Sequence, residues 1–313
     1  MTIQKDILLS VNNLSVHFKV GRRVIQAVNN VSFDVYKNEV FGLVGESGSG
    51  KTTIIRTINR INEATSGEIY FKDQLMERLE KRRVKEVSRK EEKTLKKNIQ
   101  MIFQDPAASL NERANIDYIV SEGLYNFKLF KSESERREKV VNALRSVGLL
   151  EEHLTRYPHE FSGGQRQRIG IARALVIEPE LILADEPISA LDVSIRAQVL
   201  NLMKDIQEER DLTYIFIAHD LSIIQYISDR VGVMHRGYLV ELADAEEIYE
   251  NPIHPYTKSL LSVIPQPDPR TERNRKREIY NADATSYELG EWIEVSPGHF
   301  VLGTPEEISE WTK

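Results

Sequence analysis

The residues from Gly45 to Thr52 fit the pattern G-x-x-x-x-G-K-[ST] at every fixed position. This pattern is typical of a phosphate-binding loop, because glycines let backbone N–H groups curl around phosphate oxygens and the following helix points its positive end at them. Lys51 is expected to neutralise the β- and γ-phosphate oxygens, and the Thr52 hydroxyl to ligate Mg²⁺. The sequence therefore predicts a nucleoside triphosphate site, formed by Gly45, Ser47, Gly48, Ser49, Gly50, Lys51, Thr52 and Thr53.

Two carboxylates, Asp185 and Glu186, follow the apolar run Leu181–Ala184. The carboxyl end of a strand is where an open α/β sheet places its chemistry. We expect Asp185 to hold Mg²⁺ through water and Glu186 to polarise the attacking water. A carboxylate pair after a strand is often only a helix cap, so this assignment depends on the phosphate loop upstream.

The elements that must position these residues follow an alternating pattern. Val40–Val44 has the pattern of a short buried strand, and Ile54, Ile55, Ile58 and Ile61 recur at helical spacing after the loop. The almost continuous apolar runs Leu181–Ala184 and Thr213–Ala218 predict parallel strands covered on both faces. Strands near the phosphate loop are predicted at Ile7–Val11, Val24–Val28, Val31–Val35 and Gly67–Phe71.

Three other segments have a different texture. The charged segment 73–97 carries apolar residues mostly at helical intervals, so we predict an exposed helical excursion there. Residues 105–160 are predicted to be mainly helical, with Ser132 and Glu135 as a capping box. After Asn251 the chain is rich in proline, continues through a charged link at 270–278, and ends in a predicted β-hairpin around Pro297 and Gly298.

Composition limits the classes of function. The chain has 313 residues and a formal net charge of −6, so it has no global attraction to nucleic acid. No cysteine occurs, which excludes disulfides, thiolate zinc sites and a Cys-ligated iron–sulfur cluster within these residues. The N-terminal residues lack the apolar core of a signal peptide, and no apolar run approaches the roughly 20 residues that span a bilayer. We expect any work at a membrane to go through a partner.

A third motif, Ser162-Gly163-Gly164-Gln165, follows Phe161. Together with the phosphate loop and Asp185-Glu186 it resembles the ATP-binding subunits of ABC transporters, whose signature begins with Leu where this chain has Phe161. The resemblance implies an α/β P-loop NTPase (RecA-like) core with an antiparallel β subdomain, an inserted helical subdomain and a small C-terminal extension. The implied boundaries are 1–104 with 176–250 for the core, 105–175 for the helical subdomain and 251–313 for the extension.

The same resemblance implies roles for other residues. Gln104 matches the glutamine that contacts Mg²⁺ and water, and His219 matches the histidine that contacts the γ-phosphate. Phe18 stands where an aromatic ring stacks on adenine. Asp192 lies in the segment that communicates across a dimer. Ser162, Gly163, Gly164 and Gln165 would contact the nucleotide of the opposite subunit.

Residues 251–261 and 101–111 narrow the resemblance to ATPases that energise dipeptide and oligopeptide importers, most of all the F-type ATPase of a Gram-positive oligopeptide importer. Some relatives carry cysteines in this tail that bind an iron–sulfur cluster. This chain has no cysteine and cannot bind such a cluster in that way. The resemblance implies ATP and Mg²⁺ as cofactors and a second homologous ATPase as partner, most simply in a heterodimer. It also implies two transmembrane permeases, an extracellular peptide-binding lipoprotein, and a peripheral location on the cytoplasmic face of the cell membrane.

Several alternatives stay open from the sequence alone. A soluble ABC-type ATPase that acts on nucleic acid or ribosomes is the main rival, although such forms commonly carry coiled coils, paired nucleotide domains or zinc cysteines. A P-loop kinase is a second rival, and the Ser162–Gln165 signature argues against it. The tail can serve assembly or simply pack on the core, and the segment 73–97 can be a solvated surface or a contact for headgroups or a partner. The transported substrate (dipeptide, oligopeptide, pheromone or nickel) and the competence of the partner site are not specified.

Overall fold

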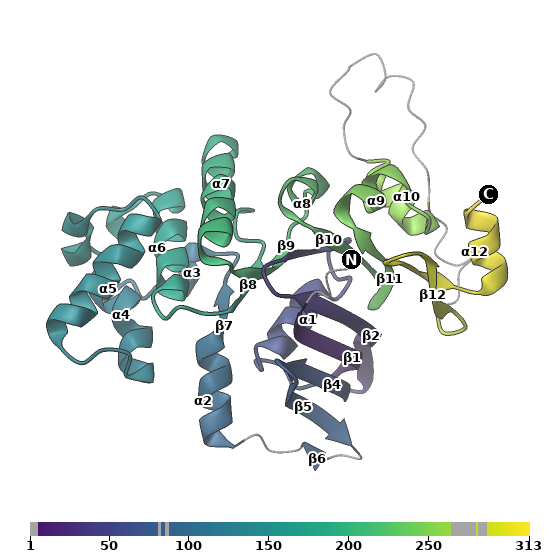
Figure 1. Ribbon diagram of the computed structural model, residues 1–313, viewed down its shortest axis with the longest axis horizontal. Coiled ribbons are helices and arrows are strands. Elements are labelled where there is room, and N and C mark those ends of the chain that lie inside the picture. The colour runs from purple at the N-terminus through teal and green to yellow at the C-terminus, as the bar shows by residue number, and fades with distance from the viewer. Residues whose placement is uncertain (1–5, 81–82, 85–87, 264–279, 281–286) are drawn as a thin grey trace. The chain divides into compact units, whose positions relative to one another are not determined.

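A computed structural model describes residues 6–80, 83–84, 88–263, 280 and 287–313 (Figure 1). The backbone groups into two compact units, and each unit is assembled from three separate stretches of chain. Unit 1 consists of Met1–Ile7, Tyr36–Asn38 and Lys85–Phe216, and unit 2 consists of Leu8–Val35, Glu39–Val84 and Ile217–Lys313. We describe each unit by itself.

Unit 1 contains neighbouring buried strands. β8 (Leu181–Asp185) lies between β7 (Ile99–Ile102) and β9 (Thr213–Ile217) in the sheet order, and β7 and β8 pair in parallel. Every residue of β8 and β9 is buried, as expected for parallel strands that are covered on both faces. The two strands predicted from these apolar runs are confirmed.

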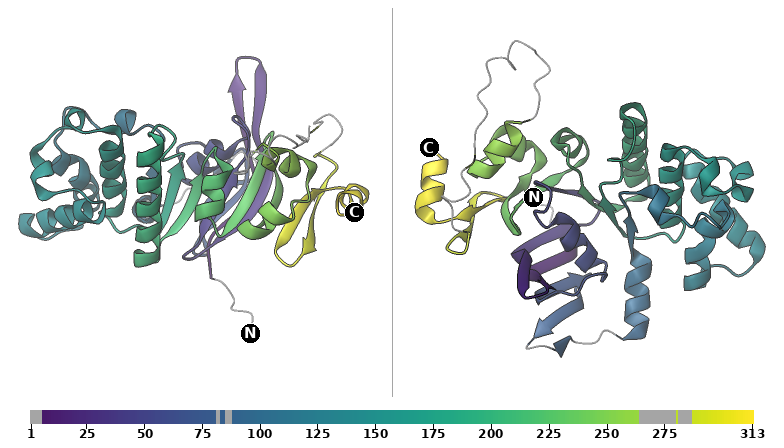
Figure 2. Two further views of the ribbon diagram at one scale, coloured as in Figure 1. Left: turned by 90° about the horizontal axis from the view of Figure 1, so that it is seen from above. Right: turned by 180° about the vertical axis from the view of Figure 1, so that it is seen from behind.

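Most of the remaining described residues of unit 1 are helical, and α4, α5 and α6 lie beside one another (Figures 1 and 2). Its helices are α2 (Arg89–Asn98), α3 (Pro106–Ser109), α4 (Ile116–Phe127), α5 (Glu133–Ser146), the 3₁₀ helices η1 (Glu151–Thr155) and η2 (Pro158–Glu160), α6 (Gly163–Leu175) and α7 (Val193–Arg210). The helical prediction for 105–160 is therefore confirmed. Ser132 caps α5 by accepting the Glu135 N–H, whereas the Glu135 carboxylate accepts from the Lys131 N–H, so half of the predicted capping box forms.

Unit 2 contains an antiparallel sheet with strand order β2-β1-β4-β5-β6. Its strands are β1 (Ile7–Val20), β2 (Arg23–Tyr36), β4 (Ser66–Phe71), β5 (Gln74–Glu80) and β6 (Arg83–Val84). The predicted strands near its start are confirmed but too short, because Val24–Val28 and Val31–Val35 form one continuous strand.

The prediction of a helix over 73–97 is wrong in its first part. β5 and β6 occupy 74–80 and 83–84, and only α2 at 89–98 is helical in the part of this segment that the structure describes. Lys72 and Asp73 both have positive φ (50° and 60°), which is the backbone of a two-residue type I′ hairpin turn. This turn folds β5 back along β4, with Phe71 opposite Gln74.

A second group of paired strands in unit 2 contains β3, which precedes the phosphate loop. β3 (Val40–Val44) pairs in parallel with β10 (Arg230–His235), β10 pairs antiparallel with β11 (Tyr238–Asp244), and β13 (His299–Gly303) joins β11 to β12 (Glu291–Ser296). The predicted C-terminal hairpin is thus confirmed, and it continues this sheet. The helices of unit 2 are α1 (Lys51–Ile58), α8 (Leu221–Ile227), α9 (Ala245–Glu250), α10 (Pro255–Leu261) and α12 (Pro305–Trp311).

The core of unit 2 explains where α1 ends. Ile54, Ile55 and Ile58 are completely buried, whereas Ile61 is 53% exposed. The helix stops at Ile58, and Arg60 has a φ of 59°, which α-helical backbone does not adopt. The prediction that the helical spacing continues to Ile61 is therefore wrong. The charged link at 270–278 lies outside the described residues, as do Pro265, Pro267 and Pro269.

None of the helices that the structure describes is both long and apolar enough to cross a membrane.

Candidate functional site

The glycines of the phosphate loop follow β3 in unit 2, and their backbone requires glycine. Gly45 and Gly50 have φ values of 140° and 107°, a region that other residues rarely adopt. A Cβ atom at Gly45 would stand 2.1 Å from the Met234 carbonyl oxygen, and one at Gly50 would stand 2.4 Å from the Ala27 carbonyl oxygen. Neighbouring backbone therefore excludes any side chain at both positions. Only glycine allows the loop to curl this tightly.

Lys51 begins α1 and points its ammonium group back into this curl. Its Nζ donates to the carbonyl oxygens of Gly45 (2.7 Å) and Glu46 (2.8 Å). The residue is only 4% exposed. A buried cation beside a curled loop backbone favours an anion as ligand. Thr52 and Thr53 follow directly in the first turn of α1.

Two further predicted residues belong to unit 2. His219 is exposed and lies between β9 and α8, where the Asp220 side chain caps α8 by accepting the Ser222 N–H at 2.9 Å. This cap fixes where the helix begins after His219. Phe18 lies near the end of β1 and is 37% exposed, so its ring has a free surface available for stacking.

Unit 1 brings Gln104 and Glu186 into direct contact. The Gln104 side-chain amide donates to Glu186 Oε2 at 2.7 Å, across 82 residues of sequence. Gln104 follows β7, and Asp185 and Glu186 stand at the end of the paired strand β8, so the parallel strands deliver them to the same edge. Asp185 and Glu186 are 3% and 7% exposed.

Glu186 has an unusual backbone. Its φ is 48°, in the left-handed region, and its carbonyl accepts hydrogen bonds from the Ser189 N–H (3.2 Å) and the Ser189 hydroxyl (3.0 Å). A non-glycine residue in this region costs about 1 kcal/mol and persists where surrounding contacts impose it. The turn after β8 therefore holds the Glu186 backbone in this conformation, while the Gln104 amide contacts its carboxylate.

The Ser162–Gln165 segment, also in unit 1, starts α6. Ser162 Oγ accepts the Gln165 N–H at 3.4 Å, and Gln165 Oε1 accepts the Ser162 N–H at 3.0 Å, which makes a reciprocal capping box. Phe161, which replaces the usual Leu, is 4% exposed and packs edge-on to the His153 ring. The apolar anchor of the motif is therefore kept.

Gly164 and Asp192 link the starts of two helices. A Cβ atom at Gly164 would stand 2.3 Å from Ile195 Cγ2 in the first turn of α7. Asp192 is the N-cap residue of α7, but its side chain makes no capping hydrogen bond. Unit 1 therefore brings the signature segment and the start of α7 into contact.

Sequence analysis missed residues that hold the phosphate loop in place. The Tyr256 hydroxyl accepts the Glu46 N–H at 3.0 Å, and the Gly237 N–H donates to the Ser49 carbonyl at 3.0 Å. Burial raises the pKa of Tyr256 to about 12, so the hydroxyl is neutral at ordinary pH. Tyr256 lies within the tail pattern at 251–261, but no local signal connects it to a loop 210 residues upstream.

The residues present fit ATP and Mg²⁺. The Gly45–Thr52 curl excludes side chains at Gly45 and Gly50, and it holds a buried cation, as a polyphosphate site requires. Thr52, Gln104 and Asp185 offer oxygen ligands, which are the ligands that Mg²⁺ prefers. The loop, Phe18 and His219 belong to unit 2, whereas the carboxylates, Gln104, the signature segment and Asp192 belong to unit 1.

Known proteins are similar to this chain in sequence and in fold. A family model described as ABC transporter matches residues 28–189, and one described as oligopeptide/dipeptide transporter, C-terminal region, matches residues 240–288. The chain is 56% identical to an oligopeptide transport ATP-binding protein OppF of Streptococcus pyogenes, over 98% of each chain. It is 56% identical to OppF of Bacillus subtilis, over 97% of this chain and 99% of that relative.

A relative from dipeptide transport and two solved structures are also similar to this chain. A dipeptide transport ATP-binding protein DppF of Lactococcus lactis is 52% identical over 100% of this chain and 99% of its own. The structure of cbiO1 from Clostridium perfringens, part of an ABC transporter complex, matches with a TM-score of 0.67 at 30% identity, over 80% of this chain and 93% of that one.

The cassette MJ0796, solved as a dimer in a post-hydrolysis state with ADP and Pi, matches with a TM-score of 0.66 at 27% identity, over 76% of this chain and 99% of that one. These likenesses confirm the predicted α/β P-loop fold. The chain belongs to the ABC transporter ATP-binding proteins, in the family of oligopeptide and dipeptide transport ATP-binding proteins.

Proposed function

We propose that this chain is the ATP-hydrolysing subunit that powers import of oligopeptides or dipeptides across the cell membrane. The observation that carries the proposal is the near full-length identity of 52–56% to peptide transport ATP-binding proteins, together with the match of residues 240–288 to their C-terminal region. As a member of this family the chain is an ATPase and a peripheral, membrane-associated subunit that works with permease subunits. Nothing favours a role on nucleic acid or ribosomes.

In this proposal the Gly45–Thr53 loop holds the triphosphate. The backbone N–H groups of the loop, including those of Ser47, Gly48 and Ser49, donate to phosphate oxygens. Lys51 transfers its ammonium hydrogen bonds from the loop carbonyls to the β- and γ-phosphates. The Phe18 ring stacks on the base. The partly exposed ring and the buried ammonium group support these two roles.

Hydrolysis is assigned to Glu186, Gln104 and His219. Glu186 accepts a hydrogen bond from the attacking water, Gln104 holds the Glu186 carboxylate and the water in line, and His219 donates to the γ-phosphate. Thr52, Gln104 and Asp185, the last through water, would hold Mg²⁺, which supplies neutralisation of the phosphate charge. The contact of 2.7 Å between Gln104 and Glu186 supports this division of roles.

The signature segment is assigned to the site of a second subunit. Ser162, Gly163, Gly164 and Gln165 present the start of α6 to the γ-phosphate that the partner binds, and Asp192 communicates across the dimer. The dimeric form of the related cassette MJ0796 supports this arrangement. ATP drives the cycle only if it binds the closed dimer more tightly than the open one.

For the whole system we propose a heterodimer with a homologous ATPase, two permeases, an extracellular peptide-binding lipoprotein and a position on the cytoplasmic face. The proposed nucleotide-binding core is 1–104 with 176–250. Residues 105–175 are the proposed helical subdomain, which contacts a permease near Gln104, and 251–313 are the extension. Co-purification of these permeases with the chain from membranes tests the assignment, and hydrolysis stimulated by nucleic acid in the isolated chain would contradict it.

Glu186→Gln tests the catalytic assignment. Loss of the carboxylate charge should lower the ATP hydrolysis rate by about 10²-fold or more, because general-base catalysis contributes that much. ATP binding should persist, and the variant with ATP should run as a closed dimer in size-exclusion chromatography.

Glu178→Gln is the matched control. Glu178 is also in unit 1 with a positive φ of 54°, but it is exposed and is not one of the predicted site residues. Its hydrolysis rate should match that of the native chain. A Glu186→Gln variant with the native turnover rate would refute the water-polarising role.

A further inference from the structure

A tyrosine from the C-terminal extension contacts the phosphate loop directly. The Glu46 N–H donates to the Tyr256 hydroxyl at 3.0 Å, and Tyr256 is only 2% exposed. Tyr256 lies in the first turn of α10, 210 residues after its partner. Both residues belong to unit 2. The contact fixes one backbone amide of the loop between Gly45 and Ser47.

The end of β10 and the turn before β11 support the loop on two other sides. The Met234 carbonyl closes against Gly45, and the Gly237 N–H donates to the Ser49 carbonyl at 3.0 Å. His235, the last residue of β10, packs against the Tyr256 ring with a centroid separation of 4.0 Å and a tilt of 31°. The tyrosine and the turn therefore form one packed support beneath the loop.

A buried carboxylate holds this tyrosine in place. Glu241 in β11 is completely buried and accepts hydrogen bonds from the Ile253 N–H (2.7 Å), the His254 N–H (3.1 Å) and His299 Nε2 (2.8 Å). His254 Nδ1 in turn accepts the Tyr256 N–H at 3.1 Å and so caps α10. Among the described residues, every donor to Glu241 comes from the chain after residue 250, so the described part of the extension holds Tyr256 in position.

We propose that Tyr256 is a positioning residue for the phosphate loop, through which the C-terminal extension sets the affinity for ATP. Loop amides bind phosphate well only when their directions are fixed before the ligand arrives. The Tyr256 hydroxyl satisfies the Glu46 N–H and keeps the loop in its curled form. The inference rests on the proposed role of Gly45–Thr52 as the triphosphate loop.

Tyr256→Phe tests the proposal in the full chain. The variant keeps the ring and its contact with His235 but loses the hydrogen bond to Glu46. Because one such bond contributes about 0.5–1.5 kcal/mol, the Kd and the KM for ATP should rise about 2–10-fold. The kcat at saturating ATP should stay at the native value, because Glu186 and Gln104 are unchanged. A purely structural role would not produce this split between KM and kcat.

Tyr287→Phe is the matched control. The Tyr287 hydroxyl lies 2.6 Å from His235 Nδ1, in the same cluster, and the bonds described for it go to His235 and Tyr280 rather than to the loop. Its ATP affinity should equal that of the native chain. A thermal unfolding curve for each variant confirms that it is folded at the assay temperature.

Two outcomes would overturn the inference: native ATP affinity in Tyr256→Phe, or an equal loss of affinity in Tyr287→Phe. Lys51→Ala separates this inference from the proposed function. It should greatly weaken ATP binding if Gly45–Thr52 is the triphosphate loop. Normal affinity in Lys51→Ala would refute the loop assignment itself, whereas weak binding there with native affinity in Tyr256→Phe would refute only the positioning role.

Discussion

At the scale of single residues, Gly164 shows that one glycine can have two separate reasons to be a glycine. The signature pattern suggests bare backbone for phosphate, yet Ile195 Cγ2 would lie 2.3 Å from a Cβ atom at this position. Helix packing alone therefore excludes a side chain. The sequence showed the first reason and not the second, because Ile195 is on a different helix.

Gly164→Ala separates these reasons. The added methyl group should push α6 from α7 and cost about 1–3 kcal/mol in the free energy of unfolding, measured with urea. Ile195→Ala removes the obstructing methyl group, so the double variant should recover most of this loss, as a coupling energy in a double-mutant cycle. A coupling energy of zero would contradict the packing explanation. ATPase activity that stays lost while stability returns would assign the glycine to phosphate approach.

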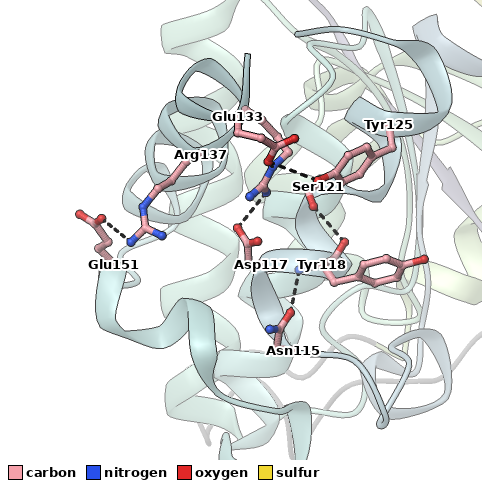
Figure 3. A network of polar contacts seen from close by, with 9 residues as sticks. Asn115, Asp117, Tyr118, Ser121, Tyr125, Glu133, Arg137 and Glu151 are labelled. Carbon is pink, nitrogen blue, oxygen red and sulfur yellow. Dashed lines mark hydrogen bonds and ion pairs between the residues drawn. The ribbon is translucent and has the colours of Figure 1, made fainter. Parts of the chain in front are cut away.

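At the scale of elements, a buried arginine joins α4 to α5. Arg136 Nη1 donates to Asp117 at 2.9 Å and its Nε donates to Glu133 at 2.7 Å, and the guanidinium lies 5.6 Å from the centre of the Tyr125 ring. Figure 3 shows Asp117 and Tyr125 on one helix, with the Tyr125 hydroxyl directed at Glu133 of the next. The hydrogen bond to Asp117 is the main reason that the pKa of Arg136 lies above its usual value.

Arg136→Ala should therefore lower the free energy of unfolding by about 2–3 kcal/mol, because it leaves a partly buried carboxylate unpaired. The neighbouring Arg137→Ala is the control. Arg137 pairs with Glu151 at 3.1 Å, but both side chains are about half exposed (59% and 45%), and exposed pairs contribute less than about 1 kcal/mol. Urea denaturation of the two variants checks the difference, and equal losses would rule out a special role for the buried pair.

Element type was predictable where one pattern dominated the local sequence. The apolar runs at Val40–Val44 and Leu181–Ala184 fold as the predicted strands, because strands covered on both faces need no alternation. The segment after Asp73 was not predictable in this way. Its turn consists of Lys72 and Asp73 rather than the usual Asn-Gly, and a charged strand pattern then resembled a helix.

At the scale of the whole molecule, buried histidines should make stability depend on pH. Burial lowers the pKa of His254 to about 3, with smaller effects from His235 and Lys258, and burial lowers the pKa of His235 to about 4. An unfolded histidine takes up a proton near pH 6.5. These groups therefore contribute their full stability above about pH 6.5 and lose it progressively as the pH falls towards 4.

The free energy of unfolding, measured with urea from pH 7.5 to pH 5, should fall with decreasing pH. The fall should be up to about 1.4 kcal/mol per pH unit for each histidine. His254→Asn should show a shallower dependence, because it removes one titrating group while an Asn oxygen can still cap α10 at the Tyr256 N–H. An unchanged slope in this variant would show that His254 does not take part.

The site was predictable from sequence to the extent that its parts are local patterns. The phosphate loop, Asp185-Glu186 and Ser162–Gln165 are each contiguous in sequence, and their assigned chemistry stays a prediction. The supports of the phosphate loop were not predictable. Met234, Gly237 and Tyr256 act through backbone or a single hydroxyl, and only the folded chain brings them to Gly45–Ser49.

The bond between Glu46 and Tyr256 also has a consequence for biosynthesis. A ribosome adds about 5–20 residues per second, so the 210 residues between the two partners take about 10–40 s to make. During that interval the emerging loop lacks Tyr256 and the Met234 carbonyl that closes against Gly45. It also lacks Glu241, whose carboxylate holds the tyrosine in position. The nascent chain therefore acquires its complete phosphate loop only after Tyr256 has been made and has left the ribosome.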